Sequence, residues 1–254
     1  MTLHTGLPAA EIVNEHGKGR VVLLCEHASA RIPEEYGGLG LAEADRLSHA
    51  AWDPGARDLT LALSAALDAP AVMSAVSRLV YDCNRPPEAA GAMPERSEMI
   101  EVPGNRGLSQ AERAARAAAV YDPFCDAVSR VLDHRGPGAV VVTVHSFTPV
   151  FFGARRAVEI GLLHDEDSRL ADAMLDHKGR LAGRRVERNE PYGPDDGVTH
   201  SLRLHAQSRG LANVMIEVRN DLMRTQESIA ARAQEILRLL EPALRDITVK
   251  EGVS

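Results

Sequence analysis

Histidine and carboxylate residues follow several apolar runs of this sequence, and residues of these types can bind a metal ion together. Glu26 and His27 come directly after one run, and His145 comes directly after another. Glu217 lies near the end of a third run, Val214 to Val218. Imidazole and carboxylate groups are the usual ligands of a catalytic zinc ion, which polarises a carbonyl and activates water. With a glutamate as proton shuttle, the pattern predicts metal-assisted hydrolysis of an amide.

Polar residues also follow the remaining apolar runs. His164 and Asp165 come directly after one of them, and the segment 77–85, Ser-Arg-Leu-Val-Tyr-Asp-Cys-Asn-Arg, follows the other. Because ligands of open α/β sheets bind at the carboxyl ends of strands, we expect all these groups at one edge of the sheet. The sequence has no compact His-Glu-x-x-His motif. Spacing alone therefore leaves hydrogen-bonded structural histidines as the alternative.

Other catalytic motifs are missing from the sequence. It has no Gly-x-Ser-x-Gly nucleophile motif, no Gly-x-x-x-x-Gly-Lys phosphate loop and no Gly-x-Gly-x-x-Gly fingerprint. The three cysteines, Cys25, Cys83 and Cys125, are too few and too scattered for a disulfide framework or a four-cysteine zinc site. Cys25 ends an apolar run, so we do not expect it to act as a thiol nucleophile.

Composition limits the class of protein. The chain has 254 residues, a net charge of −7 and 44% hydrophobic residues, which excludes a disordered or low-complexity chain. It has no apolar run of about 18 to 20 residues and no secretory signal pattern, so we expect a cytoplasmic protein without a membrane partner. The acidic balance argues against nucleic-acid binding. We expect one domain over residues 1–254, with its core at about 20–245, and make no prediction of oligomeric state.

The expected elements alternate between strands and helices. Apolar runs predict buried strands at Val21–Cys25, Ala71–Val76, Val140–Val144, Val158–Leu163 and Val214–Val218. Amphipathic spacing and caps predict helices at Ala56–Leu67, from the Ser109/Glu112 capping box to about Leu132, at Ser168–Asp176, and at Ile229–Leu244 after a Thr225 or Ser228 cap. This alternation indicates an α/β fold with a mainly parallel sheet. The segments Arg85–Gly107 and Asn189–Gly197 are expected to be long binding loops.

Six ordered motifs span most of the chain: CEHASARIP (25–33), HAAWDPGA (49–56), SRLVYDCNRPP (77–87), VVTVHSF (141–147), NEPYGP (189–194) and MIEVRNDL (215–222). Together they resemble the N-formylglutamate amidohydrolase family, from about residue 20 to about residue 240. The resemblance implies the fold of phosphorylase/hydrolase-like zinc exopeptidases. That fold has three α/β/α layers and a central, mostly parallel but mixed sheet, with the metal site at its edge.

The resemblance also implies one divalent metal ion, with zinc as the expected metal. His27 and His145 match the expected histidine ligands. Zinc exopeptidases usually place a glutamate three residues after the first histidine, but this chain has Ala30 there. Asp53 is the first choice for the third ligand and Glu26 the second; alternatively, Asp53 caps the helix that follows it. Manganese or cobalt can share such ligands.

Glu217 matches the catalytic glutamate of exopeptidase-like sites, although it could instead form a salt bridge with Arg219 or Arg78. In this interpretation it deprotonates the attacking water and returns the proton to the leaving amine. A buried carboxylate needs a partner in either case.

Several other residues are implied to bind substrate. Asn84 and Arg85 resemble the Asn-Arg pair that holds the substrate carboxylate in such exopeptidases, and a guanidinium can hold a carboxylate through two hydrogen bonds. Arg78 is expected to hold a second carboxylate or to brace the first, with Asp82 orienting one of these arginines. The further candidates come from two neighbouring motifs: Tyr192, Arg203 and His205.

The resemblance implies the hydrolysis of N-formyl-L-glutamate to formate and L-glutamate, the last step of one histidine-degradation route. Two alternatives stay open. One is a related zinc amidase or carboxypeptidase-like enzyme that acts on another N-acyl amino acid or peptide. The other is a non-catalytic paralogue that binds a metal or a metabolite, which the Ala30 departure permits.

Overall fold

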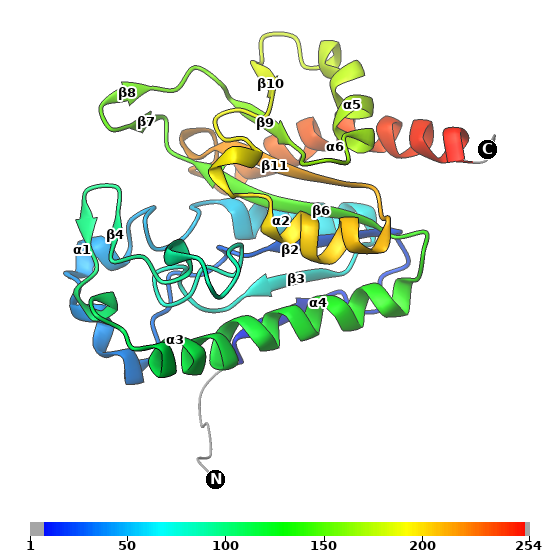
Figure 1. The fold of residues 1–254 in the computed structure, drawn as a ribbon. Helices are drawn as coiled ribbons and strands as arrows, with labels where there is room; N and C mark the ends of the chain where they lie inside the picture. The colour runs from blue at the N-terminus through cyan, green and yellow to red at the C-terminus, as the bar shows by residue number, and fades with distance from the viewer. Residues whose placement is uncertain (1–7, 252–254) are drawn as a thin grey trace.

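A central sheet of seven strands organises the protein, which is described here by a computed structural model over residues 8–251. The strand order is β1-β3-β2-β6-β11-β9-β10 (Figure 1). The strands of this sheet are β1 (Ala10–Val13), β2 (Val21–Cys25), β3 (Ala71–Ser74), β6 (Val140–Phe147), β9 (Ile160–Leu163), β10 (Val186–Arg188) and β11 (Asn213–Arg219). Two small hairpins lie outside it: β4 (Arg96–Ser97) with β5 (Ile100–Glu101), and β7 (Val150–Phe151) with β8 (Ala154–Arg155).

Helices cover both faces of the sheet. They are α1 (Glu43–Arg46), α2 (Ala56–Leu67), α3 (Gln110–Arg116), α4 (Asp122–Arg135), α5 (Arg169–Asp176) and α6 (Gln226–Glu251), with π-helical segments η4 (Ala117–Tyr121) and η7 (Leu202–Ala206). Helices α2, α5 and α6 share one hydrophobic cluster with the sheet, and η4, α4 and η7 share another on the opposite face. These three layers confirm the predicted architecture. Strands buried on both faces are apolar at successive positions, which is why the short apolar runs predicted them.

Strand directions confirm a mostly parallel, mixed sheet. Strands β3, β2, β6 and β11 are parallel to one another, whereas β1 is antiparallel to β3 and β9 is antiparallel to β11. The reversal of β9 corrects one prediction. Because Leu163 pairs with Met215 near the start of β11, His164 and Asp165 follow β9 at the opposite edge from the carboxyl ends of β2, β6 and β11.

The helix predictions were mostly accurate. Helix α2 has the predicted bounds, and the capping box forms: Glu112 N donates to Ser109 Oγ at 3.3 Å, and Ser109 N donates to Glu112 Oε2 at 2.8 Å. The helical stretch that begins there continues through η4 and ends at Arg135, three residues beyond the predicted end. Helix α6 begins after Thr225 as one of the two cap predictions had it, with Ser228 N donating to Thr225 Oγ1 at 3.1 Å.

Two strand bounds bear on the site. Strand β6 continues to Phe147, so His145 lies within a strand rather than after it. Strand β3 ends at Ser74, two residues early. Strands β1 and β10 and both small hairpins were not predicted. Within residues 8–251, no helix is long and apolar enough to cross a membrane.

Candidate metal centre and active-site cavity

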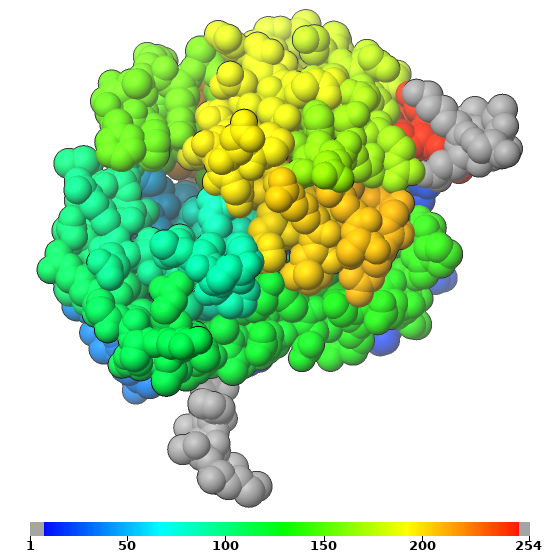
Figure 2. All heavy atoms as spheres, viewed as in Figure 1, coloured from blue at the N-terminus to red at the C-terminus, as the bar shows by residue number. Residues whose placement is uncertain are grey.

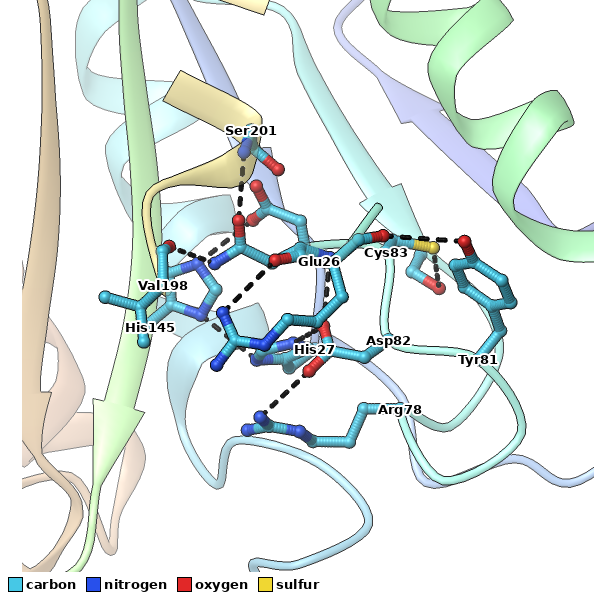
Figure 3. A network of polar contacts seen from close by, with 12 residues as sticks. Glu26, His27, Arg78, Tyr81, Asp82, Cys83, His145, Val198 and Ser201 are labelled. Carbon is cyan, nitrogen blue, oxygen red and sulfur yellow. Dashed lines mark hydrogen bonds and ion pairs between the residues drawn. The ribbon is translucent and has the colours of Figure 1, made fainter. Parts of the chain in front are cut away.

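Three buried side chains, His27, Asp53 and His145, meet at the carboxyl ends of β2 and β6. His27 Nδ1 and His145 Nδ1 lie 3.2 Å and 3.0 Å from Asp53 Oδ2, and the two nitrogens lie 3.2 Å from each other. The three atoms therefore form a nearly equilateral triangle. Figure 3 shows the two histidines within one polar network.

Local structure explains why these side chains converge. Strands β2 and β6 are parallel neighbours, so the residues that follow Cys25 lie beside His145. Asp53 N donates to His27 O at 3.0 Å, which ties the segment before α2 to the end of β2. The residue that precedes the first turn of α2 is Gly55, not Asp53. The Asp53 carboxylate instead turns toward the imidazoles and accepts a 3.2 Å bond from Ser146 N.

The triangle fits a divalent metal ion. A tetrahedral ion with bonds of about 2.0–2.1 Å separates its ligand atoms by about 3.3 Å, close to the distances found here. Burial opposes the charging of His145, but Glu26 and Asp53 outweigh it and hold the pKa of His145 well above its usual range. Burial likewise opposes the ionisation of Asp53, whose pKa the imidazoles nevertheless hold below its usual range. The site thus attracts positive charge, and these three residues can hold a cation.

A carboxylate stands behind each imidazole. Asp82 Oδ1 lies 2.7 Å from His27 Nε2, and Glu26 Oε2 lies 3.1 Å from His145 Nε2 (Figure 3). Such partners fix the orientation of a metal-binding imidazole and increase its basicity. Glu26 therefore lies behind His145 rather than in the triangle, where the alternative prediction had placed it.

Glu217 lies beside the triangle with its carboxylate unpaired. It is opposite His145 in the pairing of β11 with β6, so the two side chains share a face of the sheet. Glu217 is 5% exposed, and its Oε2 has no hydrogen-bond partner among residues 8–251. Burial raises the pKa of Glu217 to about 7, and the charge on Asp53 acts in the same direction. A carboxylate with these properties is suited to general-base chemistry near neutral pH.

Neither salt bridge suggested for Glu217 forms. Arg219 Nε donates to Asp221 Oδ1 at 2.8 Å, and its Nη2 lies 3.9 Å from Glu159. Arg78 instead spans two carboxylates of the metal centre, with Nη1 3.4 Å from Asp53 Oδ1 and Nη2 3.1 Å from Asp82 Oδ2. Asp82 thus orients Arg78, as predicted, and supports His27 as well.

The centre opens into a cavity of about 590 Å³. Its outer walls come from the hairpin β4–β5, the hairpin β7–β8 and the loop that carries Tyr192. Figure 2 shows this face hollowed between the β7–β8 hairpin and the segment around β4. Both predicted binding loops therefore contribute to the cavity, through Arg85, Glu98 and Tyr192 among others.

The predicted substrate-binding residues differ in their placement. Arg85 and Asn84 line the cavity, but the Asn84 amide is occupied by backbone: it donates to Val198 O and accepts from Ser201 N at 3.0 Å. Asn84 thus anchors the segment that follows the second binding loop. Arg203 is not among the cavity-lining residues, and its guanidinium pairs with Asp165 Oδ2 at 2.6 Å.

The structure differs from the sequence analysis at two further residues. His205 does not line the cavity and is buried against the sheet, with neither ring nitrogen hydrogen-bonded within residues 8–251. Arg156 lines the cavity but was not predicted, because it follows no strand of the central sheet and belongs to none of the six motifs. Its guanidinium lies over the Tyr192 ring, 4.7 Å from the ring centroid.

Comparison with known proteins agrees with this arrangement. The N-formylglutamate amidohydrolase family model matches residues 19–224. The chain belongs to this family. As a member of the N-formylglutamate amidohydrolase family, it is a hydrolase that acts on an amide bond, and its substrate is a small molecule.

Two solved structures are similar to this member of the family. Gene product Atu2144 of Agrobacterium tumefaciens is 53% identical, with a TM-score of 0.92 over 95% of this chain and 96% of that one. An N-formylglutamate amidohydrolase from Ralstonia eutropha is 19% identical, with a TM-score of 0.67 over 97% of this chain and 100% of that one, which shows a shared fold. No curated protein matches the chain by sequence.

Proposed function

We propose that this protein is a zinc-dependent hydrolase that converts N-formyl-L-glutamate and water to formate and L-glutamate. The observation that carries the proposal is the unpaired Glu217 carboxylate beside the His27–Asp53–His145 triangle. In this proposal the reaction ends a cytoplasmic route of histidine degradation.

The triangle residues would hold the metal through His27 Nδ1, His145 Nδ1 and an oxygen of Asp53. A bound zinc ion supplies Lewis acidity at the substrate carbonyl and makes water more acidic. Asp82 and Glu26 keep the two imidazoles oriented from behind.

Glu217 moves the proton. Its carboxylate accepts a proton from the attacking water, whose oxygen forms a bond to the formyl carbon. The amide C–N bond then breaks, and Glu217 returns the proton to the leaving nitrogen. The products are formate and the free amino group of glutamate, with atoms and charge balanced. Arg78, beside Asp53 and Asp82, keeps these two carboxylates in place.

The test combines metal content with product formation. Plasma mass spectrometry of the purified protein should find about one zinc per chain, and N-formyl-L-glutamate should release formate. Metal without formate release from this substrate, but with hydrolysis of another N-acyl amino acid, would replace the substrate and keep the amidase. No metal after reconstitution, together with no hydrolysis across a substrate panel, would reject the proposal in favour of a non-catalytic binding protein.

The role of Glu217 has its own test. Glu217→Gln should lower kcat by about 10²- to 10⁴-fold because Gln cannot accept the proton. Glu187→Gln, a change on strand β10 outside the cavity lining, is the matched control and should retain full activity. Unchanged activity of Glu217→Gln would reject the assigned role.

A further inference from the structure

Arg156 brings a positive charge to the cavity without an acidic partner. It follows β8, and its guanidinium carbon lies 4.3 Å, 4.7 Å and 5.6 Å from the ring centroids of Phe151, Tyr192 and Phe147. Within residues 8–251, no carboxylate oxygen lies within 4.0 Å of its guanidinium nitrogens. The three rings lie at cation–π distance from the guanidinium carbon, and this attraction does not supply a carboxylate partner.

One edge of this guanidinium lacks a hydrogen-bond partner. Arg156 Nη1 is buried, and no atom of the described residues accepts a hydrogen bond from it. A buried donor without a partner is unfavourable, more so when it is charged. A ligand carboxylate would satisfy it, since a carboxylate can accept two parallel bonds from a guanidinium.

Three carboxylates of the cavity, Glu98, Asp53 and Asp82, already contact other groups. Glu98 Oε2 lies 2.8 Å from His49 Nε2, and Glu98 Oε1 accepts a 3.2 Å bond from Phe152 N. Asp53 and Asp82 contact the two histidines of the metal centre and Arg78. None of these three carboxylates forms an ion pair with Arg156, although the charge of Arg156 contributes to the lowered pKa of Glu98.

Comparison of the three cavity arginines separates their roles. Arg78 is neutralised by two carboxylates, whereas Arg85 donates only to backbone oxygens, those of Gly197 and Asn84. Among residues 8–251, two guanidinium groups of the cavity, those of Arg85 and Arg156, thus form no ion pair with a carboxylate. They come from different walls, one from the 77–87 segment and the other from beyond the β7–β8 hairpin.

Tyr192 connects Arg156 to the catalytic end of the cavity. Its ring lies against Arg156, and burial followed by the charge of Glu217 raises its pKa. Arg156, Tyr192 and Glu217 all line the same cavity, so Arg156 and the proposed base face the same space.

We propose that Arg156 binds the side-chain carboxylate of an N-acylated dicarboxylic amino acid, while Arg85 binds its main-chain carboxylate. This inference rests on the proposed function and assigns its substrate specificity to two residues. The sequence analysis expected Arg78 either to hold a second carboxylate or to brace the first, and in the structure its charge is already neutralised by Asp53 and Asp82.

The test removes the charge and compares two substrates. Arg156→Met should lower kcat/KM for N-formyl-L-glutamate by about 30-fold or more, mainly through KM, because a buried charge pair is lost. The kcat/KM for N-formyl-L-glutamine, which lacks the second carboxylate, should change less than about threefold. Arg156→Lys should fall between these, since it keeps the charge and loses the planar fork. Arg155→Met, an exposed neighbour outside the cavity lining, should behave as wild type.

A binding measurement separates this inference from the proposed function. Calorimetry with L-glutamate and L-glutamine needs no turnover, so it remains informative if N-formyl-L-glutamate is not hydrolysed. Wild type should bind L-glutamate more tightly than L-glutamine, and Arg156→Met should abolish the difference while melting at the wild-type temperature. Equal binding of both ligands by wild type, or an equal loss for both substrates in Arg156→Met, would overturn the inference.

Discussion

Glu26 Oε2 lies 3.1 Å from His145 Nε2, on the opposite side of the imidazole from the ligand triangle. Glu26 is fully buried, and burial would raise its pKa, but His145, Ser201 and His27 together outweigh burial and lower the pKa of Glu26. The Glu26 carboxylate and the His145 ring thus stabilise each other. The Glu-His dipeptide thus places His27, a proposed metal ligand, next in sequence to the carboxylate that supports His145.

We therefore expect Glu26 to control metal affinity without binding the metal. Glu26→Gln should weaken zinc binding by about 10- to 100-fold, the usual effect of losing such a support. Competition with a chelator measures this affinity directly. Asp82→Asn, which removes the equivalent support of His27, should give a loss of similar size. If Glu26→Gln abolished binding as completely as His145→Ala, Glu26 would be a ligand itself.

The raised pKa of Glu217 predicts a pH-dependent stability of the metal-free protein. A folded-state pKa of about 7, against 4.5 in the unfolded chain, means that this group favours folding most below pH 4.5. That contribution is lost as pH rises through 7. Gln resembles the protonated form of Glu. The free energy of unfolding of Glu217→Gln should therefore equal that of wild type near pH 4.5 and exceed it by up to about 3 kcal/mol at pH 8.

Denaturant unfolding after chelation, at several pH values, checks this prediction. Glu187→Gln, on strand β10 outside the cavity lining, is again the matched control. Zinc should reduce the difference in free energy of unfolding between Glu217→Gln and wild type, because the ion neutralises the buried negative charge. A difference in free energy of unfolding that stays constant between pH 5 and pH 8 would contradict the prediction.

His205 predicts a pH dependence of the opposite sign. Burial lowers the pKa of His205 to about 4, from an ordinary value of 6.5. Its contribution to stability is present above pH 6.5 and is lost as pH falls toward 4, because the unfolded chain binds the proton first. The free energy of unfolding should therefore fall less on acidification in His205→Gln than in wild type, by up to about 3 kcal/mol. His134→Gln, at the exposed end of α4, is the matched control.

The sequence predicted those parts of the fold and site that local patterns determine. Apolar runs located five central strands, and motifs located His27, His145 and Glu217 at the correct edge of the sheet. The direction of β9 could not be predicted, because it follows from how the chain returns to the sheet rather than from the composition of the strand. His164 and Asp165 were misplaced for that reason.

Arg156 could not be identified for a different reason. The chain has 26 arginines and 3 lysines, so a single arginine outside a motif carries little information. What distinguishes Arg156 is the group of aromatic rings around it. Phe147, Phe151 and Tyr192 come together only through the hairpin β7–β8 and the loop after β10. Such contacts between distant segments have no counterpart in local sequence.

Gly161 ties the sheet to the loop that carries Tyr192. It lies in β9 opposite Glu217, and a Cβ atom there would be 1.9 Å from Glu190 O and 2.9 Å from Leu163 Cδ1. The first of these atoms is backbone and cannot move without shifting the loop. Gly161→Ala should therefore displace the loop, lower stability by about 1–3 kcal/mol and raise KM through Tyr192.

Thermal unfolding and steady-state kinetics measure the two effects of Gly161→Ala. Gly179→Ala is the matched control, since a Cβ at that glycine would meet no atom within 4 Å. It should leave both Tm and KM unchanged. If Gly161→Ala lowered Tm but left KM unchanged, the loop would relax without moving Tyr192. Substrate binding would then depend on the arginines alone.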